Sequence, residues 1–184
     1  MNVTSSGIIN GVIGAQYGKR GMQFNENNIP TYSLPFKVEN APKGTVSLAI
    51  VLEDKDAYPV TGGFVWIHWL AANITRLEIH ENESQTATDF VQGRNSWTSI
   101  QGGEQSVELS SYYGGMTPPD KPHTYELHVY ALDKMLDIIK APDFPGGGLL
   151  VYNRQQMADI YRTGRGTVTV RARYVYDKAQ NCID

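Results

Sequence analysis

Hydrophobic and polar residues alternate along several segments of the chain, and this alternation predicts β-strands. Successive side chains of a strand point to opposite faces of the sheet, so a period of two marks a half-buried strand. Continuous aliphatic runs mark strands that are buried on both faces. The segments with one of these patterns are residues 33–38, 46–52, 64–74, 123–133 and 167–176.

The segment at residues 64–74 is apolar on both faces, so we expect it to be a central strand that is covered on each side. A buried imidazole at His68 needs a polar partner or a cavity, because an unpaired buried polar group is costly. Asp54 and Asp56 end the preceding strand and are the nearest candidates. Strict alternation predicts one face made of Phe64, Trp66, His68 and Leu70, and another made of Val65, Ile67, Trp69 and Ala71.

The remaining segments have the composition of loops and short elements. Asn153 is a plausible N-cap and Gly164 a plausible C-terminal residue for a helix between them. The other expectations are irregular or edge structure at residues 1–30, a surface loop at 75–89, a short strand at 104–109 and a short helix or turn at 135–140.

Composition limits the classes of function. The chain has 184 residues, of which 41% are hydrophobic and 19% charged, which predicts a single folded domain over residues 1–184. A net charge of −3 argues against a non-specific nucleic-acid binder. No apolar run reaches the length of a membrane span, and no secretion signal is evident, so we expect a cytoplasmic protein. Cys182 is the one cysteine and cannot form an intrachain disulfide.

A second informative segment lies at residues 111–133. Its first half is rich in Gly and Pro and predicts a bent, stiff loop, whereas its second half alternates as a strand. His123 and Tyr125 share one face at the point where the loop meets this strand. Shaped loop backbone beside rigidly held side chains is typical of a small binding site.

Several motifs occur together in a specific order. They are Asp54-Lys55-Asp56-Ala57-Tyr58-Pro59, Trp66-Ile67-His68-Trp69, Gly93-Arg94-Asn95, Tyr113-Gly114-Gly115-Met116-Thr117-Pro118-Pro119, His123-Thr124-Tyr125 and Tyr130-Ala131-Leu132-Asp133. With these motifs, residues 30–176 resemble the phosphatidylethanolamine-binding protein family, most closely its bacterial, Raf kinase inhibitor-like branch. Two departures stand in the acidic turn, where Lys55 and Tyr58 replace prolines of the family pattern.

The resemblance implies a mainly β fold of two packed antiparallel sheets with a few short helices. It also implies a pocket for a small anion or a phospho-headgroup, with no cofactor, and protein partners such as a kinase or a protease are known for some members. Bacterial relatives suggest a homodimer. The residues that the resemblance places at the pocket are Asp54, Trp66, His68, Pro119, His123 and Tyr125.

The chemistry of these residues fits an anion site. Imidazoles can donate charge-assisted hydrogen bonds, and the backbone N–H groups of Gly114 and Gly115 are candidates for an anion nest. Asp54 repels a phosphate, so its expected role is to orient a histidine or to meet an ammonium group on the ligand. The plain structural interpretation is that the histidines are satisfied core residues and the tryptophans only pack.

An enzymatic alternative uses the same side chains. One carboxylate with two imidazoles is also the ligand set of a facial-triad iron site, and Asp54, His68 and His123 could serve acid–base catalysis. The sequence lacks short His-x-Asp or His-x-x-x-His spacing and a Gly-x-Ser-x-Gly elbow. We therefore expect a non-enzymatic binding protein without a metal.

Overall fold

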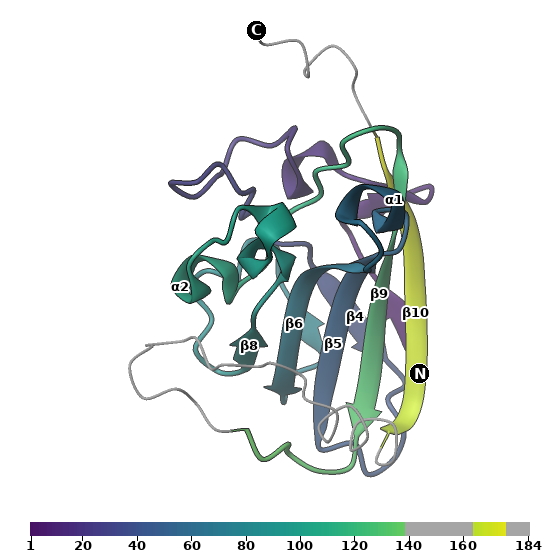
Figure 1. The fold of residues 1–184 in the computed structure, drawn as a ribbon. Coiled ribbons are helices and arrows are strands. Elements are labelled where there is room, and N and C mark those ends of the chain that lie inside the picture. Colours follow the sequence, from purple (N-terminus) through teal and green to yellow (C-terminus); the bar gives the residue numbers. More distant parts are fainter. Residues whose placement is uncertain (139–163, 176–184) are drawn as a thin grey trace, which may run out of the picture.

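The structure, a computed structural model, describes residues 1–138 and 164–175 and contains two β-sheets (Figure 1). One sheet has three strands in the order β1-β4-β7, and the other has seven in the order β2-β3-β10-β9-β5-β6-β8. Strands pair antiparallel except β3 beside β10. The strands are β1 (Asn2–Thr4), β2 (Ile8–Ile9), β3 (Val12–Ile13), β4 (Phe36–Glu39), β5 (Ser47–Asp54), β6 (Trp66–Ile74), β7 (Glu78–Ile79), β8 (Val91–Gly93), β9 (His123–Leu132) and β10 (Gly164–Tyr174).

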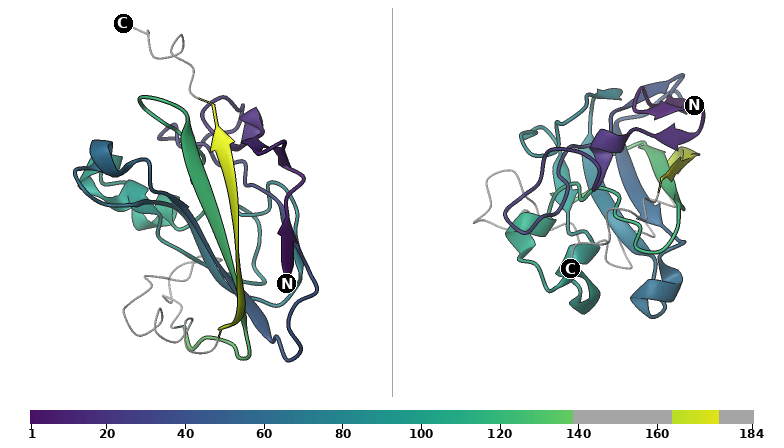
Figure 2. Two further views of the ribbon diagram at one scale, coloured as in Figure 1. Left: turned by 90° about the vertical axis from the view of Figure 1, so that its right-hand side faces the viewer. Right: turned by 90° about the horizontal axis from the view of Figure 1, so that it is seen from above.

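The two sheets pack face to face around the main hydrophobic core (Figure 2). Leu48, Ile50 and Leu52 of β5 point into this core, while Ala49 and Val51 belong to a second apolar cluster on the opposite face of the large sheet. A strand buried on both faces must read as a continuous aliphatic run, which is what residues 46–52 show. The predicted mainly β fold of two packed sheets with a few short helices is confirmed, and its strands pair antiparallel apart from β3 with β10.

A bulge in β6 changes the faces that alternation predicts. The register between β5 and β6 shifts by one residue between the pairs Leu52↔Trp69 and Glu53↔Ile67. Trp69 therefore joins the main core, and Leu70 lies in the cluster on the opposite face. Placing Leu70 on the face of His68 was wrong, because an extra residue in a strand reverses the faces beyond it. The strand also lies one position from the sheet edge, between β5 and β8.

Strands β9 and β10 follow the alternation closely. Tyr125, Leu127 and Val129 lie in the main core on β9, and Ala172 and Tyr174 join it from β10. The two strands pair over ten residues or more, with a single irregularity next to Gly164. These long antiparallel neighbours of β5 bring the start of β9 beside the end of β5.

The helical elements are short and gather at one end of the large sheet (Figure 1). They are η1 (Ala15–Tyr17), α1 (Tyr58–Thr61), η2 (Ser96–Thr98), η3 (Ile100–Gly102) and α2 (Val107–Ser110). None of the helices in the described segments is long and apolar enough to cross a membrane.

Three local predictions have different outcomes. The strand expected at residues 104–109 is wrong, because Ser106 caps α2 by accepting a hydrogen bond from the Leu109 N–H. Residues 135–138 form no helix, and Gly164 begins β10. The helix expected from Asn153 lies outside the described residues.

A buried amide ties β8 and β6 to the loop that precedes β9. Gln92 is fully buried, and its Oε1 accepts hydrogen bonds from Trp69 Nε1 at 2.8 Å and from Ser84 Oγ at 2.6 Å. Its Nε2 donates to the Ser84 carbonyl at 2.8 Å, and Ser84 Oγ in turn accepts from the Tyr113 N–H. A buried hydrogen-bond network of this kind is stabilising only when every polar group in it has a partner.

We predict that Gln92→Leu lowers the free energy of unfolding by at least about 2 kcal/mol, although leucine is more apolar. The substitution leaves the Trp69 indole and the Ser84 hydroxyl without this acceptor. Denaturant unfolding measures the change, and Gln85→Leu, at an exposed position, is the matched control with an effect near zero. Equal stability of the two variants contradicts the role given to Gln92.

Candidate functional site

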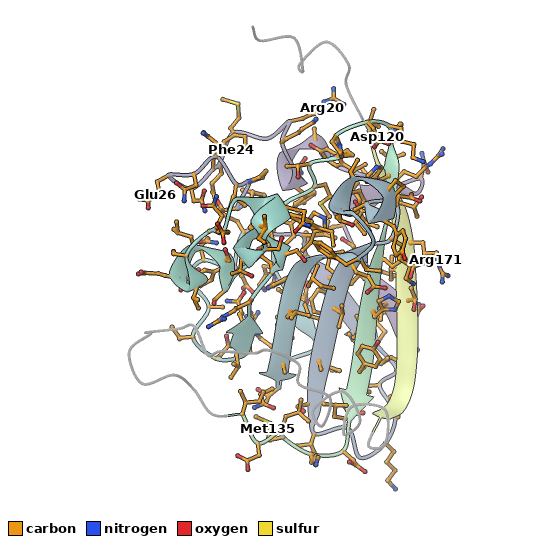
Figure 3. All side chains as sticks on the ribbon, viewed as in Figure 1. Arg20, Phe24, Glu26, Asp120, Met135 and Arg171 are labelled. Carbon is orange, nitrogen blue, oxygen red and sulfur yellow. The ribbon has the colours of Figure 1, made fainter. Side chains whose placement is uncertain are left out.

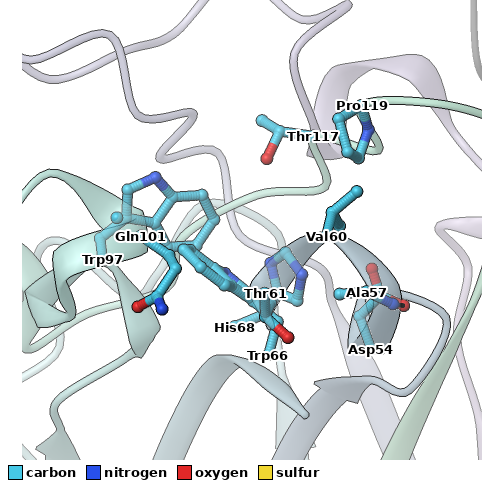
Figure 4. Close-up of a pocket in the computed structure, with 11 residues that line it drawn as sticks. Asp54, Ala57, Val60, Thr61, Trp66, His68, Trp97, Gln101, Thr117 and Pro119 are labelled. Atoms are coloured by element: carbon cyan, nitrogen blue, oxygen red, sulfur yellow. Dashed lines mark hydrogen bonds between the residues drawn. The ribbon is translucent and has the colours of Figure 1, made fainter. Parts of the chain in front are cut away.

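A pocket of about 330 Å³ opens above the adjoining ends of β5 and β6 (Figure 4). Strand ends supply its floor, α1 and the η2–η3 segment supply two sides, and the loop before β9 lies across the top. Asp120 lies at this same end of the molecule, far from Met135 at the opposite end (Figure 3). The lining residues are Asp54, Ala57, Val60, Thr61, Trp66, His68, Trp97, Gln101, Gly102, Thr117 and Pro119.

Asp54 ends β5 and starts the turn into α1. Its Oδ1 accepts a hydrogen bond from the Ala57 N–H at 3.1 Å, and its Oδ2 accepts one from His123 Nδ1 at 2.7 Å. The side chain is only 4% exposed. A carboxylate held by two donors is fixed in direction, so Asp54 presents a defined edge to the pocket.

His123 lies behind the pocket wall with both ring nitrogens bonded to carboxylates. Besides the bond to Asp54, its Nε2 lies 2.8 Å from Asp120 Oδ1, and the imidazole is fully buried. The His123 imidazole therefore links the buried Asp54 carboxylate to the Asp120 carboxylate of the overlying loop.

His68 is the imidazole that faces the pocket. Its Nδ1 lies 2.7 Å from the Gly114 carbonyl oxygen, which is its polar partner in place of the expected Asp54 or Asp56. Asp56 instead accepts a hydrogen bond from the Thr124 N–H at 2.8 Å. Burial lowers the pKa of His68 below its ordinary value of 6.5, although the nearby charge of Asp54 opposes this. His68 is thus a neutral imidazole at ordinary pH.

Gly114 and Gly115 serve the packing of the site and lie outside its lining. The Gly114 N–H donates to the His68 carbonyl and the Gly115 N–H donates to the Pro30 carbonyl, so neither is free for an anion. This corrects the expectation of a backbone nest. A Cβ at position 114 would come within 2.5 Å of the Trp97 ring, which explains why glycine is needed there.

Aromatic side chains enclose the polar groups. Trp66 and Trp97 meet edge to face with ring centroids 5.1 Å apart, and both line the pocket. Tyr125 lies beneath them, with its ring centroid 5.2 Å from that of His68. Burial, followed by the charge of Asp54, raises the pKa of Tyr125 well above 10 and keeps its hydroxyl protonated. These rings exclude water and strengthen the electrostatic interactions inside the pocket.

Half of the predicted site residues line the pocket, namely Asp54, Trp66, His68 and Pro119. His123 and Tyr125 lie directly behind this wall, in contact with Asp54 and His68 respectively. Sequence reasoning missed Ala57, Val60, Thr61, Trp97, Gln101, Gly102 and Thr117.

The sequence contains a signal that could have identified Trp97 as a pocket residue. It follows the Gly-Arg-Asn motif by two residues, and Asn95 caps η2 by accepting a hydrogen bond from the Trp97 N–H. An Asn followed by a short polar segment is typical of such a cap. The indole is thereby held over the Gly114 loop.

The geometry does not support the iron-site alternative. Both nitrogens of His123 and both oxygens of Asp54 are already hydrogen-bonded, and His123 does not line the pocket. In the described part of the chain, the three residues that bring metal-binding atoms within 4.8 Å of one another are Glu53, Glu126 and His128. They lie away from this pocket.

That second group is an ion-pair network on the outer face of the large sheet. Lys55 Nζ lies 2.5 Å from Glu126 and 3.2 Å from Glu53, and Arg171 Nε lies 2.6 Å from Glu126. His128 Nε2 donates to Glu53 at 3.0 Å. The hydrogen bond from Lys55 lowers the pKa of Glu126 to about 2. Lys55 therefore replaces a family proline with a surface ion pair that lies outside the pocket lining.

Tyr58, the other departure from the family pattern, begins α1 and is 57% exposed. Pro59 then occupies the first turn of this helix, where a missing N–H costs nothing. The one-residue displacement of the proline is therefore compatible with the helix whose Val60 and Thr61 line the pocket.

Comparisons with known proteins agree with this fold. A family model described as phosphatidylethanolamine-binding protein matches residues 3–174. The uncharacterized protein YxkA of Bacillus subtilis is 43% identical over 112 residues, which make up 59% of this chain and 66%, just under two thirds, of YxkA.

Two solved structures share the fold. The phosphatidylethanolamine-binding protein homologue CT736 of Chlamydia trachomatis matches with a TM-score of 0.69 at 22% identity, covering 95% of this chain and 97% of CT736. YbcL of Escherichia coli, described as a member of the mammalian PEBP family, matches with a TM-score of 0.67 at 23% identity, covering 96% of this chain and 98% of YbcL. Both matches show the fold alone.

We predict that His68 makes the free energy of unfolding depend on pH. Its folded-state pKa lies below 6.5, so the unfolded chain binds a proton first as the pH falls. Stability is therefore fully present above pH 6.5 and declines below it, by at most about 1.4 kcal/mol per pH unit. His68→Gln removes this slope in denaturant unfolding between about pH 7.5 and pH 5. His80→Gln, on the surface, should keep the slope, and an unchanged slope in His68→Gln contradicts the assignment.

Proposed function

Because this chain belongs to the phosphatidylethanolamine-binding protein family, we propose that its pocket binds a small phosphorylated ligand of headgroup size. The observation that supports this most strongly is the polar floor, formed by Asp54 and His68, beneath walls of Trp66 and Trp97. Small-molecule sites typically combine apolar walls with a few fixed polar groups. The pocket has this composition.

The size of the pocket also supports the proposal. Ligand sites are typically about 300–1,000 Å³, and this pocket, at about 330 Å³, lies at the small end of that range. A phosphate with a short organic substituent fits such a volume, whereas a complete lipid would leave its acyl chains outside. The ligand is therefore a headgroup or a free phosphorylated compound.

The polar atoms of the floor are held by the fold before any ligand arrives. Asp54 is fixed by Ala57 and His123, and His68 is fixed by Gly114. Preorganised groups lose little freedom on binding, so more of their interaction energy appears as affinity. The described lining contains no serine or cysteine; its two hydroxyls belong to Thr61, which bonds to the Phe64 carbonyl at 2.6 Å, and to Thr117. This lining favours binding over nucleophilic catalysis.

We expect phosphate or phosphoethanolamine, titrated to millimolar concentration, to shift the imidazole NMR signals of His68 and His123. The signals of His80 and His128 should stay fixed, because both lie outside the pocket and serve as internal controls. Histidine side-chain spectra of the wild-type chain measure all four sites. Silent signals at His68 and His123 would show that the pocket is not the binding site.

Ala57→Leu is predicted to weaken binding of the same ligands by at least about tenfold. Ala57 lines the pocket beside Asp54, and its helical backbone accepts leucine without strain, so the added methyl groups occupy ligand space. Ala87→Leu, at a partly buried position away from the pocket, is the matched control. Calorimetric titration measures both, and equal affinities would contradict the placement of the ligand.

A further inference from the structure

The described residues that line the pocket present a negative charge and no positive one. Asp54 is the only carboxylate among them, and none is lysine or arginine. A fully deprotonated phosphate placed there would face a carboxylate without a counter-charge in the wall. Like charges at close range in a water-poor site repel strongly. The ligand must therefore interact with Asp54 through something other than a bare oxyanion.

His68 adds a second hydrogen-bond acceptor to the floor. A carbonyl oxygen only accepts hydrogen bonds, so the contact of Nδ1 with the Gly114 carbonyl requires the proton to sit on Nδ1. Burial keeps the ring neutral, and Nε2 then carries a lone pair. The 2.7 Å contact with the Gly114 carbonyl occupies Nδ1, which leaves Nε2 as the ring nitrogen for a ligand. Asp54 and His68 thus both accept hydrogen bonds from a ligand.

The charged groups around the pocket floor do not make it positive. The groups that face the floor are Asp54 from β5 and His123 and Tyr125 from β9, with Asp120 attached through His123. Two carboxylates, Asp54 and Asp120, flank the one imidazole of His123, so these groups together carry no net positive charge. Tyr125 stays neutral because burial raises its pKa.

Other residues of the lining carry hydrogen-bond donors. The indole N–H of Trp66 is buried and has no hydrogen-bond partner among the described residues. A buried donor of this kind is costly until something accepts its hydrogen bond. Gln101 and Thr117 add an amide and a hydroxyl to the lining. A matching ligand must donate toward the floor and accept from the wall.

Building on the proposed function, we infer that the pocket takes its phosphate in the singly protonated form. The P–O–H group places its one proton between the Asp54 carboxylate and His68 Nε2 in a shared, three-centre hydrogen bond, and a charged oxygen of the same phosphate accepts from Trp66. The ligand class is therefore inorganic phosphate or a phosphate monoester. A phosphodiester without a donor has no proton to offer and is excluded.

Methyl phosphate and dimethyl phosphate test this directly on the full chain. Near pH 5.5 both carry a single negative charge, because the second pKa of a phosphate monoester is about 6. They then differ in the one O–H group. We expect methyl phosphate to bind at least about tenfold more tightly in calorimetric titrations, and its dissociation constant to rise about tenfold per pH unit well above pH 6.

Dimethyl phosphate also serves as the control for the protein. It does not titrate in this range, so any pH dependence of its binding reports His68 and its charged neighbours alone. Equal affinities of the two probes near pH 5.5, or tighter binding of methyl phosphate at about pH 7.5, overturn the inference and leave the proposed function standing.

Two further probes separate the remaining outcomes. Inorganic phosphate has an O–H group but no organic part, and its binding with the same pH dependence supports the inference. Glycerophosphoethanolamine is a diester that carries an ammonium group and two glycerol hydroxyls, and its binding in preference to methyl phosphate assigns the donor to one of these groups and overturns the inference. Failure of all four probes to bind instead contradicts the proposed function itself.

Discussion

The buried hydrogen bond between Asp54 and His123 is the interaction on which the site depends. It joins the end of β5 to the start of β9, residues that are 69 positions apart in the chain, and both side chains are almost fully buried. Removing one partner of such a pair typically costs about 3–5 kcal/mol, because the other charge is left uncompensated. The pair also directs Asp54 toward the pocket and, through Asp120, anchors the overlying loop.

The architecture of the large sheet makes this pair possible. Asp54 lies opposite Tyr125 in the ladder between β5 and β9, so the two strands present Asp54, His123 and Tyr125 at one end of the same face. The bulge in β6 then places His68 next to them. Core packing sets the strand register, and the register determines the chemistry of the pocket.

Much of this could be predicted from the sequence, because periodicity reports directly which side chains are buried. The alternation of β9 identified this strand and the face of Tyr125, and the aliphatic run of β5 identified a buried strand. The motifs also identified four lining residues of the pocket. For these strands and pocket residues, the local sequence pattern and the folded structure agree.

The remaining features depend on contacts between distant segments, which a local pattern does not encode. The bulge at Trp69 is invisible in the sequence because a strand with two apolar faces reads the same in either register. His123 fits the motif equally well in front of the pocket wall or behind it, and only the bonds to Asp54 and Asp120 place it behind. Gly114 reads as a nest residue, yet Trp97 and His68 use its space and its polar groups.

A crystal structure of the protein grown with inorganic phosphate tests the central claim most directly. We predict a tetrahedral anion in the pocket, with one oxygen within about 3.2 Å of both the Asp54 carboxylate and His68 Nε2. Another oxygen should face the Trp66 indole. Phosphate bound elsewhere on the surface, with only water between Asp54 and His68, would contradict the account.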